Sequence, residues 1–271
     1  MTELVKYHND LNNLSMRAWT AEEMDLFFSI LVKIRDHGTK DVILNTQDLK
    51  KLTGTDTRNS YWYKMVDGFS RKAISLYFKD TSSKSTEYMN IFSKISFNLD
   101  EKTLKLRVSE NFEYIVNQLT KNFTVYELSE FTSLNSTYSK TMYRILKQRK
   151  SVGNQGKEFS IDQFKSLLDI PDSYTANNIQ QRVLKPILKE IPEYFENFKI
   201  KTIKADTRGT PVIAYRFTWK PQFPGDKKFV YGKFENKNTK SANKKNLSLI
   251  AEKAREKRLA RLKKSTEDQT I

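Results

Sequence analysis

Apolar residues recur at helical spacing in two long segments of the chain, about residues 20–36 and 127–150. Residues three and four apart lie on one face of a helix, so both segments are predicted to be amphipathic helices packed on a core. Thr20, with Glu23 three residues later, forms a capping-box pattern that begins the first helix. The side chains predicted to point inward are Met24, Phe27, Phe28, Leu31 and Ile34 in the first segment and Leu128, Phe131, Met142, Ile145 and Leu146 in the second.

These two helices begin two copies of one longer pattern. A shift of 115 residues aligns FFSILVKIRDHG (27–38) with MYRILKQRKSVG (142–153) and, without a gap, LNTQDLKKL (44–52) with FSIDQFKSL (159–167). In each copy the long helix is followed by a short strand, a short helix, a third helix and two strand-rich segments. Two unrelated helical hairpins that match by chance are the alternative interpretation. The third helices are expected at about 58–76 and 174–190, and the strand pairs at 87–109 and 198–220.

This order of elements is typical of a winged helix, in which the second and third helices form a helix-turn-helix and the strand pair forms the wing. Pro171 suits the turn between two helices because proline ends the first of them. The segment DTRGTP (206–211) suits the tip of a wing. The sequence therefore predicts an α+β protein with two tandem winged-helix domains, near residues 1–120 and 121–222.

Charge is distributed unevenly along the chain. The formal net charge is +16 with a pI near 9.7, which indicates a polyanionic partner, either nucleic acid or an anionic membrane surface. No apolar run approaches the roughly 18 residues that a spanning helix needs, which favours nucleic acid and predicts no membrane partner. Residues 225–271 hold 14 Lys and Arg against 6 Asp and Glu, which is half of the net charge. Residues 223–271 are predicted to be a basic linker followed by an amphipathic helical tail.

Residues suited to catalysis or cofactor binding are scarce. The chain has no cysteine and only two histidines, His8 and His37, so thiolate sites are excluded and a metal-dependent nickase lacks its ligand cluster. Eight scattered glycines form no phosphate-binding loop. The acidic pair Glu22–Glu23 lies in the first turn of a helix, where it interacts favourably with the helix dipole. We therefore expect no cofactor and no enzymatic activity, and the missing cysteines together with an N-terminus unlike a signal peptide favour a cytoplasmic protein.

The segment SYTANNIQQRVLKP (173–186) contains the strongest candidate for a binding surface. Ser173 is the predicted N-cap, and one face of the helix is apolar, whereas the opposite face carries amides and bases without a carboxylate. In a helix-turn-helix this third helix enters the major groove. Asn and Gln can pair with adenine and Arg with guanine, while Ser, Tyr and Lys bind phosphates. The alternative is a merely solvated polar face. The candidate DNA contacts are Ser173, Tyr174, Thr175, Asn177, Asn178, Gln181, Arg182 and Lys185, with Lys199, Lys201, Lys204 and Arg208 on the adjoining wing.

The third helix of the first copy has a different character. It contains several large apolar residues and is interrupted by Asp67–Gly68, so a protein interface and a DNA-reading surface are equally open interpretations. The apolar residues are Trp62, Met65, Val66 and Phe69, and the candidate secondary DNA contacts are Arg58, Asn59, Tyr61 and Lys64.

Four stretches carry a resemblance to a known family: YHNDLNNLSMRAWTAEEMDLFFSILVKIRD, YSKTMYRILKQ, FKSLLDIPDSYTANNIQQRVLKPILKEI and PVIAYRFTWKP. They resemble the initiator proteins of theta-replicating, iteron-bearing plasmids, and most closely the RepB type of Gram-positive plasmids. The resemblance covers about residues 1–222. It implies tandem winged helices whose C-terminal copy reads directly repeated origin DNA. It also implies an N-terminal copy that mediates dimerisation or contacts the other end of the repeat in a monomer.

The same resemblance implies partners that composition and spacing do not reveal. These are a host initiator protein, the replicative helicase and, for the dimer, an operator palindrome through which the protein represses its own promoter. A dimeric transcriptional repressor without a replication role is one alternative, and an architectural scaffold for protein partners is another. Direct repeats upstream of the coding region would favour the initiator, whereas a lone palindrome would favour the repressor.

Overall fold

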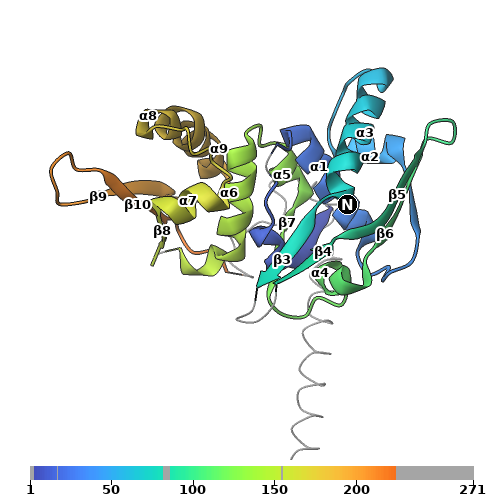
Figure 1. The fold of residues 1–271 in the computed structure, drawn as a ribbon, viewed down its shortest axis with the longest axis horizontal. Helices are drawn as coiled ribbons and strands as arrows, with labels where there is room; N and C mark the ends of the chain where they lie inside the picture. Colours follow the sequence, from blue (N-terminus) through green and yellow to red (C-terminus); the bar gives the residue numbers. More distant parts are fainter. Residues whose placement is uncertain (1–2, 17, 82–85, 154, 224–271) are drawn as a thin grey trace, which may run out of the picture. The chain divides into compact units, whose positions relative to one another are not determined.

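The repeat in the sequence is also a repeat in the fold (Figure 1). The shift of 115 residues carries strand β2 (Val42–Asn45) onto β8 (Lys157–Ser160) and helix α2 (Thr46–Leu52) onto α7 (Ile161–Leu167). Local sequence explains this agreement, because each strand ends in a residue that caps the helix after it. The computed structural model describes residues 3–16, 18–81, 86–153 and 155–223, so the predicted basic tail lies outside the described residues.

The two caps satisfy backbone N–H groups that the first helical turn leaves free. The Asn45 side chain accepts hydrogen bonds from the N–H groups of Gln47 and Asp48, at 2.8 and 3.3 Å. Ser160 and Gln163 form a reciprocal capping box, with both bonds at 3.2 Å. Both helices therefore begin directly at the end of a strand, which fixes the start of each helix-turn-helix.

Each copy also contains an antiparallel three-stranded sheet of the same topology. The orders are β2-β6-β5 and β8-β10-β9, so the strand before the helix-turn-helix pairs with the second strand of the wing in both copies. The predicted winged-helix architecture is confirmed by this topology. The wing strands are β5 (Phe92–Asn98) and β6 (Thr103–Val108) in the first copy, and β9 (Lys199–Lys204) and β10 (Val212–Thr218) in the second.

The first long helix has the predicted form. Helix α1 (Ala21–Ile34) begins at Thr20, whose hydroxyl accepts from the N–H of Glu23 at 3.2 Å while the Glu23 carboxylate accepts from the N–H of Thr20 at 2.7 Å. All five side chains predicted to point inward from this helix are buried. The third helix of this copy, α3 (Asn59–Ile74), runs without a break through Asp67–Gly68, contrary to the predicted interruption.

The second long helix was predicted wrongly as one continuous element. The segment forms α5 (Leu128–Thr132) and α6 (Thr137–Gln148), separated by a short turn. Two serines explain the break, since serine side chains compete for backbone hydrogen bonds. The Ser133 hydroxyl donates to the carbonyl of Glu130 at 2.8 Å, and Ser136 caps α6 by accepting from the N–H of Ser139 at 3.4 Å. The five predicted inward residues are nevertheless buried.

Two strand pairs were not predicted. Strand β1 (Leu4–His8) pairs antiparallel with β7 (Phe123–Glu127), and β3 (Tyr77–Thr81) pairs with β4 (Thr86–Asn90). Strands β1 and β7 lie on opposite sides of the domain boundary expected between residues 120 and 121. The position of that boundary stays a prediction. Short 3-10 or α-helical turns lie at Asn9–Asn13, Glu110–Phe112, Glu113–Val116, Lys150–Val152 and Ile191–Glu193.

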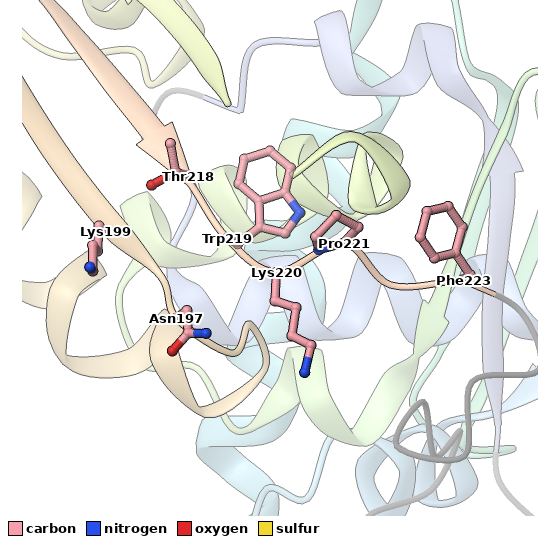
Figure 2. A pocket seen from close by; sticks show the side chains of 7 residues that line it. All are labelled: Asn197, Lys199, Thr218, Trp219, Lys220, Pro221 and Phe223. Atoms are coloured by element: carbon pink, nitrogen blue, oxygen red, sulfur yellow. The ribbon is translucent and has the colours of Figure 1, made fainter. Parts of the chain in front are cut away.

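After β10 the chain runs along a pocket of about 930 Å³, whose lining includes Trp219, Lys220 and Phe223 (Figure 2). Trp219 is only 2% exposed, and its indole N–H donates to the carbonyl of Lys150 at 3.1 Å. Its backbone N–H donates to the carbonyl of Gly153 at 3.3 Å. These two hydrogen bonds join the end of the second wing to the turn that follows α6.

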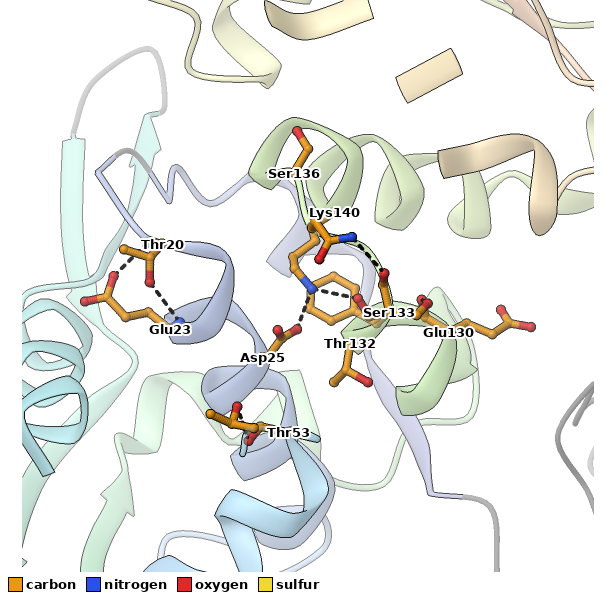
Figure 3. A network of polar contacts seen from close by, with 12 residues as sticks. Thr20, Glu23, Asp25, Thr53, Glu130, Thr132, Ser133, Ser136 and Lys140 are labelled. Carbon is orange, nitrogen blue, oxygen red and sulfur yellow. Dashed lines mark hydrogen bonds and ion pairs between the residues drawn. The ribbon is translucent and has the colours of Figure 1, made fainter. Parts of the chain in front are cut away.

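Helices α1, α5 and α6 meet around a buried ion pair (Figure 3). The Lys140 ammonium lies 2.5 Å from the Asp25 carboxylate and donates to the carbonyl of Phe131 at 2.7 Å. Burial raises the pKa of Asp25 to about 7. A second buried pair joins Lys147 to Glu130 at 2.7 Å, and Glu130 also accepts a hydrogen bond from Tyr143. Buried charges require such partners because an unpaired one is very costly.

Candidate nucleic-acid interface

The predicted reader helix is continuous but begins later than expected. It consists of α8 (Ala176–Ile179), a π-helical turn (Gln180–Leu184) and α9 (Lys185–Glu190). The predicted N-cap, Ser173, is wrong, because the Tyr174 N–H donates to the carbonyl of Pro171 at 3.0 Å and holds this stretch in a turn. Thr175 is the N-cap instead, and its hydroxyl accepts from the N–H of Asn178 at 3.3 Å.

The π-helical turn follows from a proline inside the helix. Pro186 has no N–H for the carbonyl of Arg182, and its ring would crowd that carbonyl in a regular α-helix. The N–H of Lys185 bonds instead to the carbonyl of Gln180, five residues earlier. The wider turn accommodates the proline and keeps Arg182 within an unbroken helix.

The two faces of this helix have the predicted character. Ile179, Val183, Leu184 and Ile187 are buried in the core. We call the opposite surface the reader face, and it comprises Ser173, Tyr174, Thr175, Asn177, Asn178, Gln181, Arg182 and Lys185. All eight are exposed except Tyr174 and Asn178, which are half-buried. The structure thus brings the eight candidates of the C-terminal copy onto one helix and its preceding turn.

The Arg182 guanidinium is held by a neighbour within the reader face. It lies over the Tyr174 ring, 5.4 Å from the ring centroid. The neighbouring Arg182 guanidinium lowers the pKa of the Tyr174 hydroxyl.

The wing of the second copy adds positive charge beside the reader face. Lys199, Lys201 and Lys204 are exposed on β9, and Arg208 is exposed at the wing tip. The tip closes through a bond from the N–H of Thr210 to the carbonyl of Thr207 at 2.9 Å. In the described part of the chain, none of the four cations is paired with a carboxylate. Unpaired cations of this kind can neutralise phosphates.

The candidate DNA contacts of the first copy lie on a surface that also carries a carboxylate. Arg58, Asn59, Tyr61 and Lys64 are all exposed on α3 or at its N-cap. The Tyr61 hydroxyl, however, donates to the Glu22 carboxylate at 2.7 Å, and this hydrogen bond raises the pKa of Tyr61. A carboxylate at this surface opposes the approach of a phosphate backbone, unlike the acid-free reader face.

The apolar residues of α3 do not form a surface. Trp62, Val66 and Phe69 are 0% exposed and Met65 is 9% exposed, so these side chains belong to the core. The hypothesis of an apolar interface built from them is therefore wrong. An apolar stripe at helical spacing has the same sequence signature whether it packs within the domain or against a partner.

The pocket beside Trp219 is lined by lysines, amide, hydroxyl and apolar groups without an acid or histidine. Residues 3–16, 18–81, 86–153 and 155–223 contain no group of three His, Cys, Asp or Glu suited to a metal ion. Across those same ranges, no helix is long and apolar enough to cross a membrane.

Comparisons with known proteins agree with this geometry. Residues 4–147 match the family described as Initiator Replication protein, WH1, and residues 160–219 match Initiator Rep protein, WH2. The chain is 31% identical over 193 residues to the "Probable replication protein rep" of Bifidobacterium longum, which covers 69% of this chain and 64% of that protein. It therefore spans less than two thirds of this relative. The fold is similar to that of the Pi initiator protein, solved in complex with iteron DNA, with a TM-score of 0.63, 15% identity, and coverage of 82% of this chain and 99% of the other. Because the WH1 match alone covers more than half of its residues, the chain belongs to the initiator replication protein family.

Proposed function

We propose that this protein initiates plasmid replication by binding directly repeated origin DNA, the iterons, and by recruiting the host replication machinery. The observation that carries the proposal is the acid-free reader face beside an unpaired basic wing, in the copy that matches the WH2 family. An amide-and-arginine helix face of this kind can read base edges in a major groove. The Pi initiator of similar fold was solved with iteron DNA, which supports a double-stranded DNA partner.

The proposal assigns the other parts of the chain as follows. The C-terminal winged helix, near residues 121–222, is the main reader, and the N-terminal one, near 1–120, mediates self-association and secondary DNA contacts. A host initiator and the replicative helicase are the protein partners, and the dimer represses its own promoter. The protein acts without catalysis or cofactor, in the cytoplasm.

Footprinting on the DNA upstream of the coding region tests this function directly. The purified full chain should protect direct repeats at regular spacing. In parallel, selection from a randomised duplex library should yield one preferred sequence that matches those repeats. We refer to this sequence as the selected duplex. Failure to enrich any sequence, or protection of a lone palindrome without repeats, would contradict the proposal.

Replacement of Arg182 or Asn178 by alanine should reduce sequence discrimination. Each side chain can make a bidentate contact to one base pair, so each loss should cost about 1–3 kcal/mol at that pair and relax the preference there. Binding is measured on the selected duplex, on its single-base variants and on a scrambled duplex. Equal losses on all of them would show that the residue contacts the backbone only.

Removal of the tail after Phe223 should weaken binding without changing specificity. Residues 225–271 carry 14 Lys and Arg, and each phosphate contact adds nearly one unit to the slope of log affinity against log salt. The truncated protein should therefore show a flatter slope and an unchanged ratio of affinities for the selected and scrambled duplexes. A salt titration of both proteins decides this, and an unchanged slope would assign the tail to a protein partner instead.

A further inference from the structure

The turn of the second helix-turn-helix contains an aspartate in an unusual backbone conformation. Asp169 has a φ of +52°, in the left-handed region. Its N–H donates to the carbonyl of Ser166 at 3.3 Å, and the N–H of Ile170 donates to the carbonyl of Lys165 at 2.9 Å. These two bonds form a Schellman motif, which ends helix α7. Glycine is the usual residue at this position, because a side chain makes the left-handed conformation less favourable.

The first copy forms the same turn with a glycine. The shift of 115 residues places Asp169 on Gly54, whose φ is +66°. The N–H of Gly54 donates to the carbonyl of Lys51 at 3.2 Å, and the N–H of Thr55 donates to the carbonyl of Lys50 at 3.4 Å. The backbone of this turn therefore does not require an aspartate, so the reason for Asp169 lies in the contacts of its side chain.

The Asp169 side chain reaches the segment that precedes α1. One carboxylate oxygen accepts a hydrogen bond from the Ser15 hydroxyl at 2.7 Å, and the other accepts from the Met16 N–H at 3.1 Å. Asp169 is half-buried and Met16 is buried. The turn of the second helix-turn-helix is thus bonded to residues more than 150 positions earlier in the chain.

This N-terminal segment is itself attached to the first copy. The Lys72 ammonium, on α3, donates to the carbonyl of Ala18 at 2.7 Å. The Trp19 ring packs edge to face against Phe27 and Phe69, with ring centroids 5.5 and 5.7 Å apart. The bonds of Asp169 therefore join the helix-turn-helix of the second copy to the core of the first.

Other contacts between the two copies are made by α6. Lys140 pairs with Asp25 at 2.5 Å, and the Asn12 amide donates to the Gln148 side chain at 3.0 Å. Helix α6 also packs against α9, the C-terminal part of the reader helix. One point of attachment leaves a rotation about it possible, whereas a second point restricts that rotation. Asp169 supplies such a point at the turn itself.

We propose that Asp169 is a positioning residue, which sets the orientation of the helix-turn-helix relative to the N-terminal copy without touching DNA. The two copies then contact one duplex at a fixed separation, and a fixed orientation lowers the entropy that binding costs. This inference rests on the proposed function, in which both copies contact the origin DNA. It makes the spacing within each repeat part of what the protein recognises.

The test inserts one base pair at successive positions across the selected duplex and measures the affinity of the full chain for each product. An inserted base pair moves the flanking parts of the duplex apart by about 3.4 Å and rotates them by about 35°. The base pair whose preference Arg182→Ala relaxes marks the part that the second copy reads. Insertion between this part and the part contacted by the first copy should cost the wild type at least about tenfold in affinity, as the loss of one base contact does.

Asp169→Gly removes the side chain and keeps the turn, as Gly54 does in the first copy. It should reduce the cost of such an insertion by at least about threefold. Asp169→Asn suits the left-handed conformation and retains one acceptor oxygen, so its value should lie between those of wild type and Asp169→Gly. Single-base preferences in the part read by the second copy should change less than about twofold in both variants.

Asp36→Gly is the matched control. Asp36 also has a left-handed backbone, with a φ of +65°, and its carboxylate accepts from the Gln118 N–H at 3.2 Å, within the first copy. This variant should respond to insertions as the wild type does. The inference is overturned if Asp169→Gly responds like the wild type, if Asp36→Gly responds like Asp169→Gly, or if Asp169→Gly loses its single-base preferences, which would show a disturbed helix-turn-helix. If the wild type tolerates every insertion outside the part read by the second copy, the proposed DNA contact of the first copy fails, and the inference fails with it.

Discussion

Replacement of Lys140 by methionine should lower the free energy of unfolding by about 3–5 kcal/mol at pH 8. The Lys140 side chain is 0% exposed and the Asp25 side chain is 10% exposed, so water cannot take the place of the missing ammonium. Methionine keeps most of the volume of the lysine stem, and the loss therefore reports the missing ammonium, which leaves Asp25 either as an unpaired carboxylate or as a protonated acid. Denaturant unfolding of the full chain, compared with wild type, measures it.

Two further variants identify the cause. Lys51→Met removes an ion pair of similar composition from the surface, where Lys51 and Asp48 lie 3.4 Å apart and are 80% and 67% exposed. This change should shift stability by less than about 1 kcal/mol. The double variant Asp25→Leu with Lys140→Met removes both charges and should recover most of the stability. If the double variant is as unstable as Lys140→Met alone, lost packing and not an unpaired charge is responsible.

The same pair predicts a dependence of stability on pH. Burial raises the pKa of Asp25 from its ordinary 3.8 to about 7. Between these values the unfolded chain has released the proton while the folded protein still binds it, so the stability contributed by Asp25 falls as pH rises from about 4 to 7. The difference in unfolding free energy between wild type and Asp25→Asn should decline across this window, by at most roughly 1.4 kcal/mol per pH unit. A difference that is constant from pH 4 to 7 would contradict the raised pKa.

Replacement of Gly153 by alanine should cost about 3 kcal/mol or more, at the upper end of the range for overpacking. A Cβ atom at this position would lie 2.3 Å from the carbonyl oxygen of Trp219 and 2.5 Å from the indole atoms Cδ1 and Nε1. Neither can move easily, because Trp219 is 2% exposed and its indole N–H is bonded to Lys150. The expected result is a lower midpoint of thermal unfolding together with a disturbed tryptophan fluorescence spectrum.

Gly68→Ala is the matched control for this substitution. Gly68 lies inside α3, and its added Cβ would have no neighbour closer than 3.5 Å, at the Glu23 carboxylate. Alanine favours helix more than glycine does, so this variant should gain about 0.5–1 kcal/mol. Destabilisation of both variants to a similar extent would show that the loss at Gly153 does not come from the close contact with Trp219.

Local signals in the sequence were sufficient for most of the architecture. The capping residues Asn45 and Ser160, each at the end of a strand, determine where α2 and α7 begin, because the bonds involved span only three residues. Helical periodicity identified the core of α1 and the apolar side of the reader helix for the same reason. The reader face was predictable as well, since the absence of acids along one helix is visible without knowledge of the fold.

Contacts between distant segments could not be predicted in this way. The pairing of β1 with β7 joins residues more than 100 positions apart, and neither strand has a strong pattern of its own. The apolar residues of α3 allow two interpretations from the sequence, whereas in the structure they are buried and α3 packs against β5 and α1. The apolar pattern of a helix face predicts that the face is buried, but it does not predict which element or partner covers it.

The sequence by itself determined the repeat of two winged helices and the chemistry of the reader face, because both arise from bonds and spacings within single elements. Only the tertiary structure decided how these parts are held. It placed Lys140 against Asp25 and Trp219 against Gly153. Each of these contacts depends on the packing of elements that are remote along the chain, and packing is a property of their combined shapes, which no local pattern contains.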